Sequence, residues 1–276
     1  MEYAFKIGSF GLRWYSLLIV IGLLAGALVA QREAKRRGED PNHVFSALVV
    51  CLVLALIGAR AYHVIDQWQY YRENPQLIPA LWKGGIGIFG AIVGSITGMF
   101  IYARLNHLSV PRWLDIGAPG LILVQAIGRW GNYFNQELYG RPTNLPWGIN
   151  IDLGHRVEGY TSYEKFHPLF FYESMWNLLS FVILLFAARR FAGRLRDGDI
   201  VLLYGMLYPL GRFLLEFLRI GNWKAGELPV AQIISVVAFV ACGTALWYRH
   251  RHRATQSRAA RRAMARAAMK RANRES

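Results

Sequence analysis

Tyr208, Arg212 and Glu216 recur at four-residue intervals near the end of an apolar segment, and Arg219 follows three residues later. Residues spaced by four lie on one face of a helix, so these side chains form one polar stripe. A charge inside a membrane span costs about 2.5–3.5 kcal/mol, and the stripe must therefore face protein or a polar cavity. It is either an internal salt-bridge network that fixes helix packing or part of a ligand site.

Other apolar segments also carry polar residues, at the end that we expect to lie at the same membrane depth as this stripe. These residues are Tyr15, Arg60, Arg129, His167 and Glu173. We expect no comparable set near the opposite ends of these segments. Guanidinium groups match phosphate or carboxylate oxygens with two parallel hydrogen bonds. Because phospholipid phosphates lie at the depth of Arg129 and Arg212, we expect a polar pocket that draws in a lipid headgroup.

The sequence gives no indication of a metal or cofactor site. Its seven histidines are scattered, and no two of them stand at ligand spacing near a carboxylate on one helix. A Gly-x-Ser-x-Gly elbow and a phosphate-binding loop are both missing from the sequence. We therefore expect a site without metal or cofactor.

The chain that carries these residues has the composition of a membrane protein. Of its 276 residues 54% are hydrophobic and 18% are charged, whereas a soluble domain has about 25% charged residues. A helix needs about 20 apolar residues to cross a membrane. Seven segments meet or approach that length: 14–30, 44–64, 84–103, 113–128, 169–188, 200–218 and 230–248.

We therefore predict an all-α integral membrane protein with seven transmembrane helices, in which residues 1–248 form the catalytic domain and residues 249–276 a basic tail. The segments after the first, third, fifth and seventh spans hold 20 Lys and Arg, and the opposite side holds ten. Basic residues favour the cytoplasm, so this predicts the N-terminus outside and the C-terminus inside. The longest connection, 132–168, is then an extracytoplasmic loop region after the fourth helix.

The net charge of +15 comes mainly from the tail, where residues 249–276 contain ten of the 32 Lys and Arg and one of the 17 Asp and Glu. We therefore expect no nucleic-acid partner. The tail is interpreted as an amphipathic helix on anionic membrane lipid or as a solvated segment that fixes topology. Cys51 and Cys242 lie in apolar segments, where a structural disulfide is not expected.

The stretch 128–141, GRWGNYFNQELYGR, resembles the signature of the bacterial prolipoprotein diacylglyceryl transferases. It departs from that signature at Tyr133, where the family usually has Phe. Four other stretches look similar in the same order along the chain: 14–15, 115–119, 167–173 and 208–219. The resemblance implies an enzyme of the bacterial plasma membrane, with its active site on the outer-leaflet side.

The resemblance also implies a reaction. The family moves the diacylglyceryl group of phosphatidylglycerol onto the lipobox cysteine thiol in the signal peptide of a prolipoprotein. The products are a thioether and glycerol 1-phosphate, and the transfer is the first step of bacterial lipoprotein maturation. The expected partners are therefore phosphatidylglycerol, prolipoprotein signal peptides and the surrounding membrane lipids.

The family's lipid-binding arginine corresponds to Arg129 and its second essential arginine to Arg212. We expect both to stabilise the charge on the leaving phosphate. His167 and Glu137 are both candidate bases for the thiol, and Tyr15 is a weaker one. Many relatives have a histidine where this chain has Phe89. The resemblance marks further important positions at Tyr15, Asn132, Glu137, Gly140, Tyr208 and Glu216.

Two other classes of protein could use the same features. A transporter or channel for an anionic solute would use the same arginines, but it would need polar positions continuing to the inner face or a repeat between halves. A structural membrane scaffold would leave the signature stretch unexplained. We therefore favour the transferase.

Overall fold

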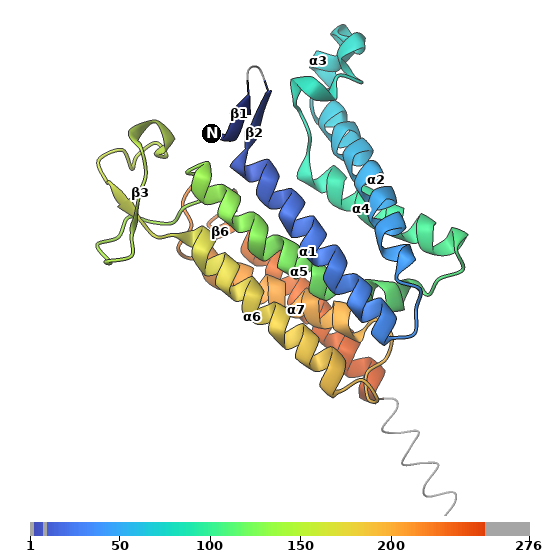
Figure 1. The fold of residues 1–276 in the computed structure, drawn as a ribbon. Helices are drawn as coiled ribbons and strands as arrows, with labels where there is room; N and C mark the ends of the chain where they lie inside the picture. The colour runs from blue at the N-terminus through green and yellow to red at the C-terminus, as the bar shows by residue number, and fades with distance from the viewer. Residues whose placement is uncertain (1–2, 8–9, 252–276) are drawn as a thin grey trace, which may run out of the picture.

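A computed structural model of the chain describes residues 3–7 and 10–251, and most of the basic tail lies outside the described residues. Each of the seven apolar segments coincides with a long helix (Figure 1). These helices are α1 (Trp14–Arg36), α2 (Asn42–Asp66), α4 (Ile88–Leu105), α5 (Val110–Phe134), α6 (Leu169–Arg190), α7 (Asp199–Glu216) and a C-terminal helix (Val230–Arg251).

Short elements complete the structure. The helix α3 (Trp68–Glu73) and two single turns, Pro75–Leu77 and Leu81–Lys83, connect α2 with α4, and a third turn, Leu153–His155, lies in the loop after α5. Three antiparallel hairpins pair β1 (Tyr3–Ile7) with β2 (Phe10–Arg13), β3 (Ile149–Asn150) with β4 (Lys165–Phe166), and β5 (Lys224–Ala225) with β6 (Leu228–Pro229).

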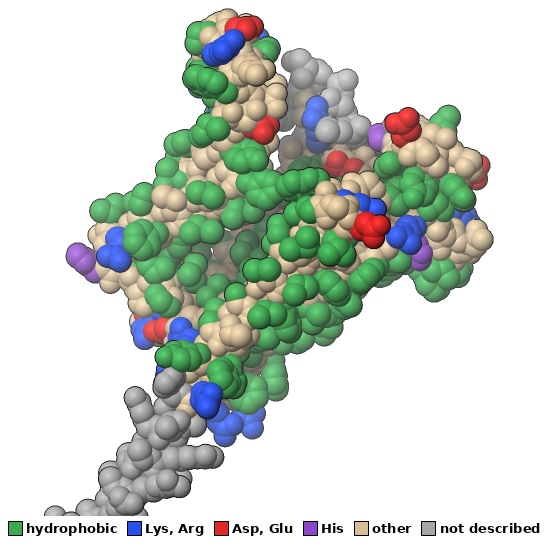
Figure 2. Space-filling model, turned by 180° about the vertical axis from the view of Figure 1, so that it is seen from behind, with side chains coloured by type: hydrophobic (Ala, Val, Ile, Leu, Met, Phe, Trp, Pro, Cys, Tyr) green, Lys and Arg blue, Asp and Glu red, His purple; other side chains and the backbone are tan. Residues whose placement is uncertain are grey.

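Within the described residues, five helices are long and apolar enough to cross a membrane: α1, α2, α4, α6 and the C-terminal helix. The other two long helices, α5 and α7, contain charged residues such as Asp115, Arg129 and Arg212. Hydrophobic side chains cover much of the surface between the two charged ends of the molecule (Figure 2). The protein is thus a largely helical, multi-pass membrane protein.

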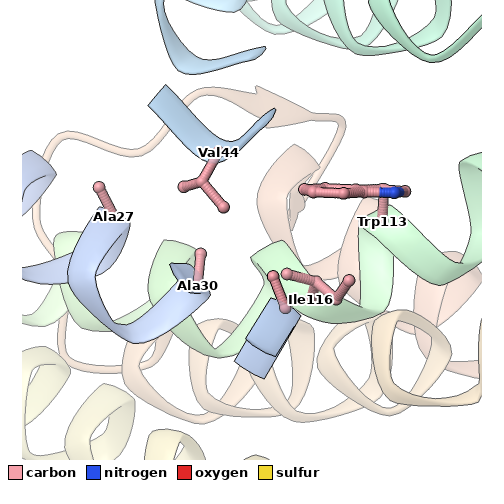
Figure 3. Packing of buried hydrophobic residues seen from close by; sticks show 6 residues of the cluster. Ala27, Ala30, Val44, Trp113 and Ile116 are labelled. Carbon is pink, nitrogen blue, oxygen red and sulfur yellow. The ribbon is translucent and has the colours of Figure 1, made fainter. Parts of the chain in front are cut away.

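Helices α1, α5, α6 and α7 pack together, whereas α2 and α4 pair with each other beside them (Figure 1). The buried face of α4 includes Gly90, Gly94 and Gly98, small residues that let two membrane helices approach closely. This pair, the α2–α4 arm (residues 42–105), meets the other helices through Val44, which packs near Ala27 and Ala30 of α1 and near Trp113 of α5 (Figure 3).

The helix bundle has two ends, which we call the loop end and the tail end. At the loop end α5 finishes at Phe134 and α6 begins at Leu169, and at the tail end the C-terminal helix finishes at Arg251. Helix α5 continues six residues beyond Gly128, where the fourth apolar segment ends. The helix continues because Arg129 and Asn132, which lower the hydropathy there, are covered by neighbouring protein.

The expectation that the tail end has no comparable polar set was wrong. Glu33, Asp115 and Asp199 are each 1% exposed there, on α1, α5 and α7. Glu33 pairs with Arg189 at 3.0 Å. Asp115 accepts hydrogen bonds of 2.9 Å from the backbone N–H groups of residues 198 and 201. These contacts join α1 to α6 and α5 to α7 at the tail end.

Candidate functional site

A single buried carboxylate, Glu173 of α6, lies at the centre of the polar group at the loop end. Its Oε2 is 2.7 Å from Nε of Arg129, and its Oε1 is 3.0 Å from Nη1 of Arg212. The two arginines come from the end of α5 and the end of α7. Glu173 is 7% exposed, so both ion pairs are largely shielded from water.

Two further charges extend this group along α7. Glu216 is 4% exposed and lies 2.5 Å from Nη2 of Arg212, so these two residues of the stripe form the ion pair that one of its two interpretations requires. Arg219 lies 4.0 Å from Oε1 of Glu173. Burial, followed by the positive charge of Arg212, lowers the pKa of Arg219. Three guanidinium groups thus face two carboxylates, an excess of one formal positive charge.

A small pocket lies beside these charges, with an empty volume of about 220 Å³ that includes space open to the surface. The ring of Trp176 packs against Gly211 and donates a hydrogen bond of 2.8 Å to the carbonyl of Leu207. A side chain at position 211 would overlap that ring, which explains a glycine there. The pocket is lined by Arg129, Glu173, Trp176, Asn177, Tyr208, Gly211, Arg212 and Leu215.

Tyr15 faces another side of α5. Its ring packs on Gly131, where any side chain would overlap it, and it is 39% exposed. Arg129 turns instead toward α6 and α7. Within the described residues the structure does not join Tyr15 to the arginine group by a hydrogen bond or ion pair.

The signature stretch leaves α5 through a strained turn. Gln136 and Leu138 have φ angles of 51° and 55°, which are uncommon for residues with a side chain. The backbone N–H of Glu137 donates to the carbonyl of the buried Asn132 at 3.0 Å. Gln136 and Leu138, neither of them a glycine, thus form the turn after the helix.

Glu137 is exposed, and its carboxylate accepts a hydrogen bond of 3.1 Å from the side chain of Asn135. Among the described residues it forms no ion pair with Arg129 or Arg141, and Arg129 pairs with Glu173 instead. The turn therefore holds the Glu137 side chain away from the arginine group in this conformation.

Gly140 and His167 lie side by side near the two ends of the loop region between α5 and α6. The backbone N–H of Gly140 donates to the carbonyl of His167 at 2.9 Å, and a Cβ at Gly140 would lie 2.8 Å from that of His167. His167 Nδ1 is 3.2 Å from the hydroxyl of Tyr172, which also accepts a hydrogen bond from Trp147. Gly140 thus provides room for the loop to pack against the histidine.

Two residues singled out from the sequence lie on the α2–α4 arm. Arg60 donates to the carbonyls of Leu77, Ile78, Gly84 and Gly85 and so fixes the connection between α2 and α4. Its contacts are structural, which corrects the expectation that it joins the polar group. Phe89, at the start of α4, lies beside Tyr62 with ring centroids 5.8 Å apart.

Trp176 and Asn177 were not predicted as site residues, and Glu173 and Arg219 were placed in the polar group without an assigned role. Glu173 was visible as a carboxylate in a resembling stretch, and Arg219 as the residue that continues the stripe. Trp176 and Asn177 follow Glu173 by about one helical turn, a spacing that could have indicated the same face of α6. The structure brings Arg129, Arg212, Tyr208 and Glu216 together as predicted.

Comparison with known proteins identifies what the chain is similar to. The family model for prolipoprotein diacylglyceryl transferase matches residues 2–248. A phosphatidylglycerol–prolipoprotein diacylglyceryl transferase from Chloroflexus aggregans is 45% identical over 260 residues, with 87% of this chain and 85% of the relative covered. The enzyme of that name from Gloeobacter violaceus is 45% identical over 253 residues, covering 91% and 93%. The one from Nostoc sp. is 43% identical over 244 residues, covering 87% and 86%.

Proposed function

The chain belongs to the prolipoprotein diacylglyceryl transferase family, and we propose that Arg129 and Arg212 bind the phosphate of its phosphatidylglycerol donor. The enzyme transfers the diacylglyceryl group of phosphatidylglycerol to a prolipoprotein, the reaction that its relatives' names state. The observation that supports the assignment is the shared carboxylate, Glu173, which holds both guanidinium groups beside one pocket.

In this proposal the acceptor is the lipobox cysteine thiol of the prolipoprotein signal peptide. The thiolate attacks the glyceryl carbon that bears the phosphate, a carbon–sulfur bond forms, and the carbon–oxygen bond breaks. The electron pair of that bond leaves with the phosphate, so glycerol 1-phosphate departs with one more negative charge than the diester. Hydrogen-bond donors placed beforehand at the leaving oxygen lower this barrier.

Arg129 supplies such donors, because Glu173 engages its Nε and both Nη groups form no ion pair with the described residues. Arg212 is fixed from two sides, by Glu173 and Glu216. Tyr208 lines the same pocket and Asn132 lies one turn beyond Arg129, so both are assigned to the remaining phosphate or headgroup oxygens. We assign positioning roles to Glu216, which pairs with Arg212, to Gly140, which packs against His167, and to Tyr15, which packs on Gly131.

The proposed base is His167, with Glu137 as the competing candidate. The loop keeps Glu137 exposed, whereas His167 lies between Gly140 and Tyr172. For His167 to accept the thiol proton at Nε2, its Nδ1 must carry the hydrogen and donate to the Tyr172 oxygen. A substrate with a low thiol pKa would need neither residue.

We further propose seven transmembrane helices, in which α5 and α7 join the five apolar ones. Helix α5 packs against α1, α6 and α7, so neighbouring protein covers its polar side chains. The distribution of basic residues supports an external loop end and a cytoplasmic tail end in the bacterial plasma membrane. The active site then lies at outer-leaflet depth, with residues 1–248 as the catalytic domain and 249–276 as the cytoplasmic tail.

The alternative of a transporter for an anionic solute gains no support. Between Asp115 and Arg129 the buried face of α5 carries Ala118, Ile122 and Ala126. Ile122 packs in a cluster with Leu184 of α6, and both are fully buried. An apolar layer at Ala118 and Ile122 therefore separates Asp115 from Gln125 and Arg129 along α5.

The direct test is mass spectrometry of a lipobox peptide after incubation with the purified protein and phosphatidylglycerol vesicles. A mass gain of one diacylglyceryl group on the cysteine is the expected result, and a peptide with its cysteine changed to serine should remain unmodified. Absence of the adduct across several detergents and vesicle compositions would contradict the proposal.

A further inference from the structure

A large apolar groove lies between the α2–α4 arm and the helices α1, α5 and α7. Its empty volume is about 1160 Å³, part of it open to the surface. No charged side chain is among its lining residues, and its hydroxyl groups belong to Ser95 and Tyr204. Near the tail end its wall includes the cluster of Ala27, Val44 and Trp113 (Figure 3). Its surface is thus suited to hydrocarbon chains.

Tyr204 is one of the two hydroxyl residues in this apolar wall, and its partner Gln125 lies outside the lining residues. The hydroxyl of Tyr204 on α7 accepts a hydrogen bond of 3.0 Å from Nε2 of Gln125 on α5. The other amide atom, Oε1 of Gln125, is buried without a hydrogen-bond partner. If the amide turns by 180°, Oε1 accepts from the tyrosine hydroxyl and the two amide N–H groups become free donors. With Nε2 as the donor, the hydroxyl of Tyr204 keeps a hydrogen that the described contacts do not use, whereas with the amide turned the free donors lie at the buried position of Oε1.

Tyr204 also connects the groove to the arginine group. Its ring stacks on Tyr208 with the ring centroids 5.9 Å apart and the planes at 15°. Tyr208 lines the small pocket that contains Arg129 and Arg212. Tyr204 and Arg212 are eight residues apart on α7, about 12 Å along the helix axis.

We propose that the hydroxyl of Tyr204, held by Gln125, donates to an ester carbonyl of the donor lipid, at the point where its acyl chains enter the apolar groove. The inference rests on the proposed function, because it places the donor phosphate at Arg129 and Arg212. An ester carbonyl is an acceptor without a donor hydrogen, which complements the unused donor of the pair. An ether-linked chain lacks the carbonyl and would leave that donor unpaired, so the site selects diacyl over dialkyl donors.

The test compares phosphatidylglycerol with its dialkyl ether analogue of equal chain length, because the bond broken in transfer is the same in both. KM and kcat for transfer to a lipobox peptide are measured with the parent protein, Tyr204→Phe and Gln125→Leu. Tyr62→Phe on the α2–α4 arm is the matched control, since Tyr62 does not line the groove. Thermal stabilisation of each protein by each lipid gives a binding measurement that needs no turnover.

We expect the parent to show a KM about 3- to 10-fold higher for the ether donor, the range of one neutral hydrogen bond. Tyr204→Phe and Gln125→Leu should raise KM for the ester donor to the ether value and leave kcat and the ether KM unchanged. Equal KM and equal thermal stabilisation by both lipids in the parent would overturn the inference, whatever the variants do. Ester-selective stabilisation without transfer would support this site and contradict the proposed reaction instead.

Discussion

The carboxylate of Glu173 lies 2.7 Å from Nε of Arg129, so the first turn of α6 fixes a guanidinium near the last turn of α5. The second oxygen of the same carboxylate is 3.0 Å from Arg212. Both arginines are therefore oriented before any lipid binds. Fixing donors in advance removes the reorganisation that water or flexible side chains would need during the reaction.

Arg129→Ala should abolish transfer while the protein remains folded in the membrane. Loss of a charge-assisted phosphate contact should lower the rate on the order of 10²-fold or more. Arg129→Lys should restore little, because an ammonium lacks the planar pair of donors. The rate of adduct formation on the lipobox peptide is the measurement.

The control for the arginine variants is Arg72→Ala, since Arg72 is 62% exposed on the connection between α2 and α4. Its transfer rate should match the parent. Near-normal transfer by Arg129→Ala would remove Arg129 from the site and leave Arg212 and Arg219 as the remaining phosphate ligands.

Glu173→Gln should lower the thermal stability and the transfer rate together. The amide keeps the shape of the side chain but leaves three partly buried guanidinium groups with one carboxylate, Glu216. Removing one partner from a buried ion pair typically costs about 3–5 kcal/mol. The unfolding temperature in detergent is compared with that of Glu158→Gln, an exposed loop variant. An unchanged unfolding temperature would show that Glu173 does not hold the two arginines together.

The positions of the long helices could be predicted because each apolar segment is long and bounded by charged residues. The hydropathy ended the fourth segment at Gly128, whereas α5 runs to Phe134. Sequence composition cannot distinguish a polar residue at a helix end from one that is covered by neighbouring helices. The partner of Arg129 is on α6, and only the packing of α5 against α6 identifies it.

Only the part of the site that lies on one helix could be predicted from the sequence. The stripe of Arg212 and Glu216 follows from helical spacing alone, and the structure confirms their ion pair. The central position of Glu173 could not be predicted, because it depends on contacts with Arg129 of α5 and Arg212 of α7. Arg60 shows the opposite error, because a buried arginine that binds loop carbonyls has the same sequence signal as one that binds a ligand.

His167→Gln should lose transfer more severely than Phe89→Leu. Glutamine can bond to Tyr172 but cannot accept the thiol proton, whereas Phe89 has no titratable group and lies on the α2–α4 arm. The measurement is the rate of thioether formation by both variants and the parent at neutral pH.

Raising the pH should partly restore His167→Gln. A free cysteine has a pKa near 8.5, so alkaline solution supplies the thiolate nucleophile without a base. The rate of the variant relative to the parent should therefore rise as the pH passes that value. If His167→Gln matches the parent from neutral to alkaline pH, His167 is structural, and Glu137 or unassisted ionisation of the thiol becomes the better assignment.

Truncation after Arg251 should leave transfer intact, whereas truncation after Tyr248 should destabilise the protein. The buried Asp199 lies 3.1 Å from Nε of Arg249 and 2.7 Å from Nε2 of His250, so the last turn of the C-terminal helix neutralises a carboxylate at the start of α7. Loss of both partners leaves a buried charge uncompensated. Unfolding temperature and transfer rate are measured for both truncations, after their expression has been matched because basic residues there also influence insertion. Equal stability of the two shortened chains would show that Arg249 and His250 contribute nothing to holding α7, and loss of turnover by the longer one would contradict a tail remote from the site.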